Sequence, residues 1–222
     1  MPTIQERIKH ITATIPTNVR LVAVSKYQPE EYILDAYSAG QRIFGESHAQ
    51  ELRLKHEHLP KDIEWHFIGH LQTNKVKYIA PFVAMIHSVD SFRLLEEINK
   101  QAAKTQRTIP CLIQVHIAQE ETKFGFTPEE CVEFFAQKEW QQFKHIKIKG
   151  LMCMASNTED EDRIKNEFRS VHELFLHIKN NLLDDKDDFT ECSWGMSDDY
   201  PIAIDEGSTL VRIGSLIFGE RG

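Results

Sequence analysis

The chain has 222 residues, of which 41% are hydrophobic and 27% charged, so it can bury one substantial core and we expect a single domain over residues 1–222. Its formal net charge of -8 argues against a nucleic-acid partner, because a phosphate-backbone binder needs a basic face. Apolar runs such as Leu21 to Val24 are too short to cross a bilayer, and the start MPTIQERIKHI lacks the apolar region of a signal peptide. We therefore expect a cytoplasmic protein without membrane contact.

Short apolar runs rich in β-forming residues alternate with longer segments of helical period along the whole chain. This pattern is typical of a parallel sheet wrapped by helices. The expected strands lie near Arg20–Ser25, Ile43–Gly45, Trp65–Ile68, Met85–His87, Cys111–His116, Ile146–Met152, Glu191–Ser193 and Leu210–Ile213. Eight strands predict a closed (β/α)8 TIM barrel, an α/β fold, rather than an open sheet.

Several expected helices have clear sequence boundaries. Thr127-Pro128-Glu129-Glu130 is a capping box with proline at the first helical position. Ser91 precedes an amphipathic segment, and a third helix is expected from Asp160 to about Asn180. The acidic run from Leu183 to Asp188 is predicted to be a solvated loop.

Lys26 is the first candidate for chemistry. It follows the apolar run Leu21–Ser25, at the expected carboxyl end of the first strand, where barrel active sites are built. A lysine amine attacks an aldehyde only when it is neutral, and a partly desolvated pocket lowers its pKa toward that condition. Taken alone, a lysine at a strand end is more often a surface residue than a reactive one.

Two segments rich in small residues follow the seventh and eighth strands, where barrels often bind phosphate. They are Ser193–Ser197 and Arg212–Ser215. Small residues let backbone N–H groups approach phosphate oxygens, while Ser197 and Ser215 add hydroxyl donors. A short helix beginning at Ser215 would point its dipole at the anion. Two such turns in register with Lys26 are a more specific signal of a binding site than either turn alone.

The segment Trp65–Lys75 runs from the third strand into the next helix and could line a pocket. His66 and His70 lie four apart in strand and loop, with no acidic partner to complete a metal site, so packed or hydrogen-bonded histidines are the better interpretation. No Ser-His-Asp or Cys-His set is evident, and G-x-S-x-G is absent. The four cysteines form no CxxC pair, which predicts reduced and mostly buried thiols.

Taken together, these segments make the chain resemble the pyridoxal phosphate homeostasis protein family, whose barrel is shared with the amino-terminal domain of bacterial alanine racemase. The resemblance covers almost the whole chain. Its motifs here are Leu21–Lys26, Phe44-Gly45-Glu46, Trp65–Lys75, His87–Ser91, Lys123-Phe124-Gly125-Phe126, Gly150-Leu151-Met152, Gly195-Met196-Ser197-Asp198 and Gly207–Gly214.

The resemblance implies a site for pyridoxal 5′-phosphate (PLP). Lys26 would form the Schiff base, Ser197 with the backbone of Gly214 and Ser215 would hold the phosphate, and Arg212 would face the pyridine nitrogen. The remaining cofactor-binding candidates are Met196, Ser47 and His66. The chain departs from the family pattern at Ser47-His48, where the family usually has Asn-Tyr, and at His116, where it usually has Asn.

An arginine beside the pyridine nitrogen disfavours protonation of that nitrogen and so weakens the electron sink needed for carbanion chemistry. Alanine racemase also uses an arginine, so this residue alone does not exclude catalysis. The chain also lacks the length for the second domain of alanine racemase, which supplies a catalytic tyrosine there. We therefore expect a monomeric, non-catalytic PLP carrier in vitamin B6 homeostasis, with PLP-dependent apo-enzymes as candidate recipients.

Three alternatives remain open from the sequence. The first is a small PLP-dependent, racemase-like enzyme that uses His116 or Tyr200 as a base. The second is a class I aldolase-like barrel in which Lys26 acts on a phosphorylated sugar. The third is an interaction scaffold that meets PLP-dependent enzymes.

Overall fold

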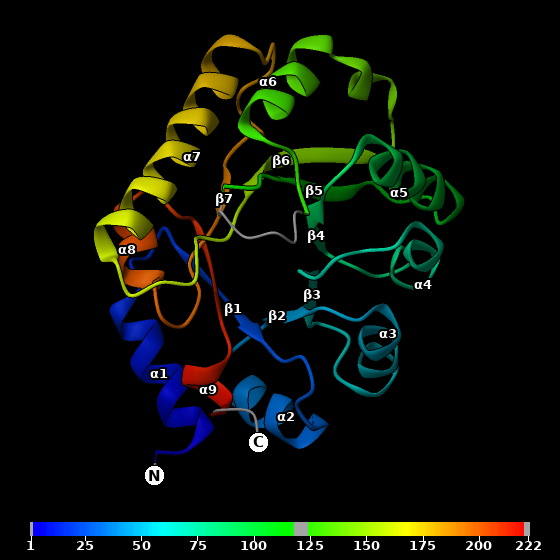
Figure 1. The fold of residues 1–222 in the computed structure, drawn as a ribbon. Helices are drawn as coiled ribbons and strands as arrows, with labels where there is room; N and C mark the ends of the chain where they lie inside the picture. Colours follow the sequence, from blue (N-terminus) through cyan, green and yellow to red (C-terminus); the bar gives the residue numbers. More distant parts are fainter. Residues whose placement is uncertain (1, 118–123, 220–222) are drawn as a thin grey trace.

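The computed structural model describes residues 2–117 and 124–219. Eight parallel strands form a closed barrel, and helices pack around its outside (Figure 1). The strands are β1 (Arg20–Val24), β2 (Ile43–Glu46), β3 (Glu64–Phe67), β4 (Met85–Val89), β5 (Ile109–Gln114), β6 (Ile146–Met152), β7 (Glu191–Ser193) and β8 (Leu210–Ile213). The predicted TIM barrel and its eight strand positions are therefore confirmed.

One helix precedes β1, and the others follow the strands in alternation. They are α1 (Ile4–Thr14), α2 (Glu30–Ser38), α3 (Ala49–His58), α4 (Val76–Ile79), α5 (Phe92–Lys104), α6 (Pro128–Gln137), α7 (Glu161–Asn181), α8 (Tyr200–Asp205) and α9 (Ser215–Phe218), with single 3-10 turns at Thr73–Lys75 and Glu139–Gln142. The predicted caps are present, because Thr127 and Glu130 form a reciprocal capping box and Ser91 accepts a hydrogen bond from the Leu94 amide. Asp160 caps α7 in the same way. Residues 184–187 of the expected Leu183–Asp188 loop are exposed, whereas Leu183 is buried and Asp188 is partly exposed.

Closure of the barrel comes from the parallel pairing of β1 with β8. Arg20 lies opposite Leu210, and Ala23 opposite Ile213. Because side chains alternate along each strand, one set faces the helices and the other fills the interior. Val22, Met85, Leu112, Met152 and Leu210 make a buried apolar cluster that is separate from the main core. This interior cluster is the packed base on which the polar end of the barrel rests.

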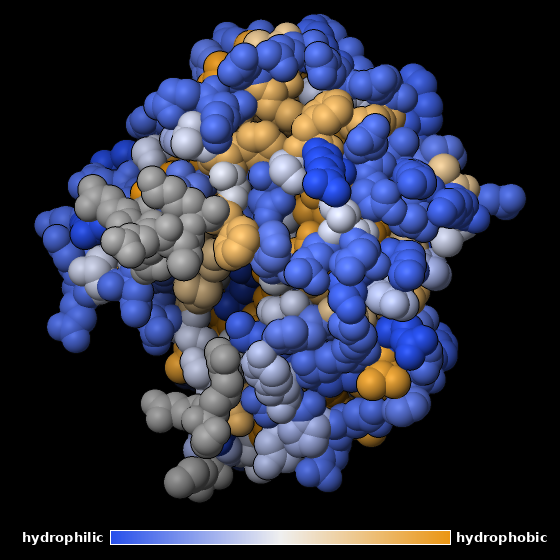
Figure 2. Space-filling view, turned by 45° about the vertical axis from the view of Figure 1, so that its right-hand side comes forward, coloured by the Kyte–Doolittle hydropathy of each residue, from blue (hydrophilic) through white to orange (hydrophobic). Residues whose placement is uncertain are grey.

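Hydrophilic side chains cover most of the face seen in Figure 2, and apolar surface shows mainly in the upper part of that view. Among the described residues, no helix combines the length and apolar character needed to cross a bilayer. All four cysteines are buried and unbonded to each other, as the sequence predicts.

Candidate functional site

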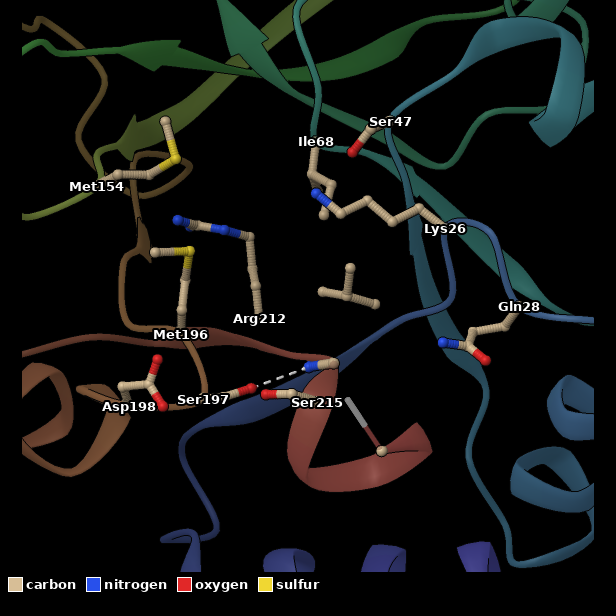
Figure 3. A pocket seen from close by; sticks show the side chains of 13 residues that line it. Lys26, Gln28, Ser47, Ile68, Met154, Met196, Ser197, Asp198, Arg212 and Ser215 are labelled. Carbon is tan, nitrogen blue, oxygen red and sulfur yellow. Dashed lines mark hydrogen bonds between the residues drawn. The ribbon is translucent and has the colours of Figure 1, made fainter. Parts of the chain in front are cut away.

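A cavity of about 240 Å³ opens at the carboxyl ends of the strands (Figure 3). The described residues that line it are Val24, Lys26, Gln28, Ser47, Ile68, Met154, Met196, Ser197, Asp198, Arg212, Gly214, Ser215 and Gly219. Drug-sized ligands occupy pockets of about 300–1,000 Å³, so this cavity suits a smaller molecule. It lies at the end of the barrel where active sites of this fold occur.

Lys26 enters the cavity because of strand alternation. Val24 faces inward and lines the cavity, Ser25 points outward and is buried against the helices, and Lys26 points inward again. Figure 3 shows its side chain extending toward Ile68, which follows β3. Lys26 is half-buried, and its side chain lines one side of the cavity.

The two turns after β7 and β8 meet on the opposite side of the cavity. The Gly214 amide donates a hydrogen bond to Ser197 Oγ over 3.3 Å, which ties the turns together. Ser215 begins α9, so its hydroxyl and the first backbone amides of that helical turn lie beside Ser197. A Cβ at Gly214 would come within 3.3 Å of Val24, which explains the small residue there. The turns thus offer a cluster of hydrogen-bond donors suited to an oxyanion.

Arg212 forms the inner wall of the cavity and is only 4% exposed. Its Nη1 donates to the carbonyl and hydroxyl oxygens of Ser193, at 2.7 and 2.6 Å, and its Nη2 donates to the Cys153 carbonyl at 2.9 Å. Burial lowers the guanidinium pKa from its ordinary value, yet arginine remains charged in proteins. These three bonds are fewer than the five N–H groups can make, so the guanidinium retains the capacity to donate to a ligand.

A buried chain of hydrogen bonds continues from Arg212 into the barrel. His87 Nδ1 lies 2.8 Å from Ser193 Oγ, and His87 Nε2 lies 2.8 Å from His66 Nδ1. Burial lowers the pKa of His66 to about 3 and that of His87 well below its ordinary value, so both rings are neutral. Arg212 donates to Ser193 Oγ, and the tautomers of the two histidines set the donor and acceptor in the Ser193–His87 and His87–His66 contacts. This series of hydrogen bonds therefore holds the Arg212 guanidinium from the barrel interior.

Seven of the eight cofactor-binding candidates meet at the cavity, and His66 is the one that does not line it as described. His66 precedes the lining residue Ile68 by two positions on the same inward face, so it lies one layer deeper. Its link to the cavity runs through His87 and Ser193 to Arg212. Sequence position gave its face but not its depth.

The other histidines of the polar segments also have structural partners. His70 Nδ1 lies 2.9 Å from a carboxylate oxygen of Asp90. Within the described residues, no group of three or more His, Cys, Asp or Glu side chains is arranged to hold a metal ion. His48 precedes α3, with its Nε2 3.2 Å from the Tyr27 hydroxyl. Packed and hydrogen-bonded histidines are thus what the structure has.

Six lining residues were not named individually from the sequence, although Ile68 belongs to the segment Trp65–Lys75 that was expected to line a pocket: Val24, Gln28, Ile68, Met154, Asp198 and Gly219. Val24 and Ile68 could have been found from the alternation along β1 and β3. Met154 follows β6 by two residues and is inward-facing for the same reason. Asp198 is the unexpected member, since its carboxylate belongs to the same turn as Ser197.

Comparison with known proteins identifies the family. A family model described as the N-terminal domain of alanine racemase matches residues 1–222. The pyridoxal phosphate homeostasis protein of Helicobacter pylori is 41% identical over 206 residues, which cover 91% of this chain and 88% of the relative. That of Aquifex aeolicus is 40% identical over 205 residues, with coverage of 91% and 87%. The chain belongs to the pyridoxal phosphate homeostasis protein family.

Solved structures agree with the family assignment. PipY of Synechococcus elongatus without PLP has a TM-score of 0.91 and 33% identity, covering 98% of this chain and 100% of PipY. The PipY structure with PLP bound has a TM-score of 0.88 and 32% identity, with the same coverage. Alanine racemase of Clostridium difficile, at 13% identity and a TM-score of 0.71, shares the fold; the match covers 99% of this chain but 56% of the racemase. The predicted family and barrel type are confirmed.

Proposed function

We propose that this protein binds PLP as a Schiff base on Lys26 and serves in intracellular PLP homeostasis without turning over an amino acid. One cavity gathers an amine, two hydroxyls and a guanidinium, contributed by Lys26, Ser197, Ser215 and Arg212, and this observation carries the proposal. A relative of known structure with PLP bound supports the choice of ligand.

The residues present fit PLP group by group. Lys26 is placed to attack an aldehyde, and the hydroxyls of Ser197 and Ser215, with the backbone of Gly214 and Ser215, can donate to a phosphate. Arg212 has N–H capacity for an acceptor at the inner end of the cavity, where a pyridine nitrogen would lie. When bound, PLP supplies the electrophilic aldehyde and the electron-withdrawing ring.

Two features together favour a carrier over a racemase-like enzyme, and the first alone does not exclude catalysis. A cation at Arg212 disfavours protonation of a neighbouring ring nitrogen, which weakens carbanion stabilisation. The two bases considered for an enzyme, His116 and Tyr200, are not among the described lining residues, and the Tyr200 hydroxyl faces Thr14 of α1 at 3.5 Å. We propose that the protein acts as a monomer and passes PLP to apo-enzymes.

The test is to add PLP to the purified protein, record the visible absorption spectrum, reduce with borohydride and map the modified lysine by mass spectrometry. Wild type and Lys75→Ala, which changes a lysine after β3 at the same end of the barrel, should give the adduct on Lys26. Lys26→Ala should give none. Equal adduct formation by Lys26→Ala, or no adduct in wild type, would refute the assignment.

A second measurement addresses turnover. Single-enantiomer amino acids are incubated with the PLP-loaded protein in deuterated water, and α-proton exchange is followed by NMR. We expect no exchange above that of free PLP. Sustained exchange that depends on Lys26 would favour the enzyme.

A further inference from the structure

The turn that carries Lys26 has an unfavourable backbone conformation. The Gln28 amide donates to the Ser25 carbonyl over 3.0 Å, so Ser25–Gln28 form a tight turn with Lys26 at its second position. Tyr27, at the third position, has φ of 64°, in the left-handed region that is unfavourable for a non-glycine residue. The Tyr27 residue is 62% exposed, so burial of its ring does little to offset this cost. Other contacts must therefore hold the turn.

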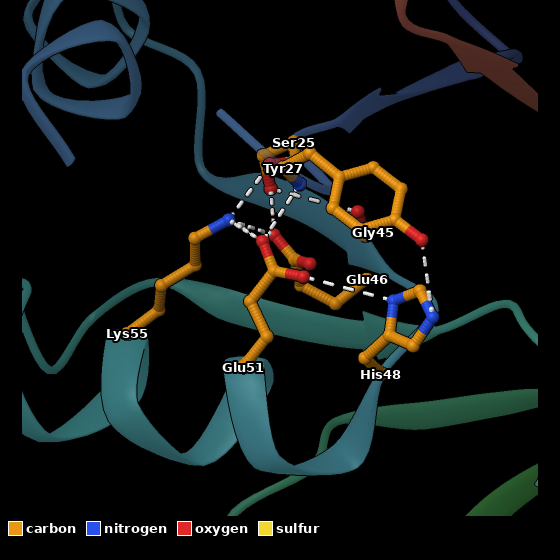
Figure 4. Close-up of polar contacts among 7 residues, drawn as sticks. All are labelled: Ser25, Tyr27, Gly45, Glu46, His48, Glu51 and Lys55. Atoms are coloured by element: carbon orange, nitrogen blue, oxygen red, sulfur yellow. Dashed lines mark hydrogen bonds and ion pairs between the residues drawn. The ribbon is translucent and has the colours of Figure 1, made fainter. Parts of the chain in front are cut away.

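Two side chains of α3 hold the peptide groups on either side of Lys26 (Figure 4). Lys55 Nζ donates to the Ser25 carbonyl over 2.7 Å, and Glu51 Oε1 accepts from the Tyr27 amide over 2.7 Å. The first of these groups belongs to the peptide entering Lys26, and the second to the peptide leaving it. Fixing both peptide planes fixes the backbone dihedrals of Lys26, and with them the direction of its side chain.

These contacts belong to a buried ionic cluster of Ser25, Glu46, Glu51 and Lys55. Lys55 Nζ lies 2.8 Å from Glu46 Oε1 and 2.6 Å from Glu51 Oε1, and the Ser25 hydroxyl donates to Glu46 Oε1 over 2.6 Å. The side chains of Lys55 and Glu46 are 7% and 0% exposed. Buried ion pairs often add no stability over apolar packing. The cluster is therefore better explained by its effect on the backbone geometry of the turn than by a contribution to stability.

The cluster lies between the barrel wall and α3, outside the cavity. Ser25 and Glu46 face outward from β1 and β2, while Lys26 faces inward. Their influence on the cavity passes through the backbone of the turn. We propose that Lys55 and Glu51, supported by Glu46, are positioning residues that aim the Lys26 amine at its substrate aldehyde; this inference rests on the proposed function of Lys26.

The central experiment measures the rate at which PLP forms its adduct with Lys26 in folded protein. Lys55→Met removes the cation and the bond to the Ser25 carbonyl, and we expect the rate to fall about tenfold or more, since small misplacements of reacting groups have effects of this size. Glu51→Ala should slow the reaction as well. Glu51→Gln should recover much of the rate, because its amide oxygen can still accept from the Tyr27 amide.

A matched control separates positioning from general destabilisation. Arg107 is a partly buried cation that donates to the carbonyls of Ala80 and Val83, each over 2.7 Å, at the opposite end of the barrel. Arg107→Met should lower the melting temperature and leave the adduct rate unchanged. Equal slowing by Arg107→Met, or a wild-type rate in folded Lys55→Met, would overturn the proposal.

A readout without PLP distinguishes this inference from the proposed function. Amide hydrogen exchange at Tyr27 should accelerate in Glu51→Ala and Lys55→Met, and remain slow in Arg107→Met. Unchanged exchange at Tyr27 would overturn the clamp even if PLP binds Lys26. If exchange at Tyr27 accelerates in these variants but wild type forms no adduct with PLP, the clamp on the turn is supported and the PLP assignment is refuted.

Discussion

Glu46 provides a measurable link between pH and folding. Burial raises its pKa to about 7, against an ordinary value of 4.5, while Lys55 and the Ser25 hydroxyl oppose the rise. Its Oε2 has no hydrogen-bond partner among the described residues, which agrees with a carboxyl that the fold prefers to protonate. Between these two pKa values the folded chain binds more protons at this site than the unfolded chain, so the site's contribution to stability falls as pH rises.

The magnitude follows from the two pKa values. The full difference corresponds to about 3 kcal/mol, of which about 2.5 kcal/mol is lost between about pH 5 and about pH 8. Glu46→Gln keeps an oxygen acceptor for Lys55 and cannot ionise. Its free energy of unfolding, measured relative to that of wild type, should therefore be about 2.5 kcal/mol larger at about pH 8 than at about pH 5.

Urea unfolding followed by tryptophan fluorescence at both pH values measures this difference. The comparison with Glu46→Gln removes the contributions of His66, His87 and the other groups common to both proteins. Glu64→Gln, at an exposed position of β3, controls for loss of a carboxylate as such. If the stability difference between wild type and Glu46→Gln is the same at both pH values, the reasoning about the buried carboxyl is refuted.

Three further predictions concern the phosphate turn, the sheet and the thiols. Ser197→Ala removes a hydroxyl donor, so PLP titration should show affinity about tenfold weaker, and unchanged affinity would argue against this turn as the phosphate site. Gly150→Ala would place a Cβ 1.8 Å from the Glu191 carbonyl, so thermal or urea unfolding should show a loss of about 2 kcal/mol or more; wild-type stability would contradict that contact. Burial raises the pKa of all four cysteine thiols, that of Cys131 to about 12. A thiol reagent should therefore label the native protein slowly and should label all four thiols after denaturation. Fast labelling of the native protein would contradict the buried positions of the thiols.

The fold was largely predictable because its signals are local. Apolar runs such as Leu21–Val24 and caps such as Thr127 and Ser91 act over a few residues, and the structure has them where the sequence places them. The site was predictable in part for the same reason, since Lys26 and Arg212 occupy strand ends that the barrel brings together.

Features that depend on three-dimensional depth were not predictable. His66 faces the interior as its strand position requires, but the stagger of the strands places it below the cavity. Lys55 looks like an ordinary charged residue of a helix, and nothing local marks it as buried against the end of β1. Asp198 shares a turn with Ser197, yet only the packed turn shows that both line the cavity.

The apolar cluster inside the barrel has a consequence for how a ligand enters and leaves the cavity. Three members of this cluster lie two positions before lining residues of the cavity: Val22 before Val24, Met152 before Met154, and Leu210 before Arg212. Because side chains alternate along a strand, the cluster packs directly beneath the cavity. Among the described residues, this cluster closes the cavity from the barrel interior, so we expect a bound molecule to enter and leave at the carboxyl ends of the strands. Under the proposed function, a recipient protein would therefore bind at the same end of the barrel where free ligand enters. While bound there it would block ligand entry, so uptake and transfer of the ligand would exclude each other.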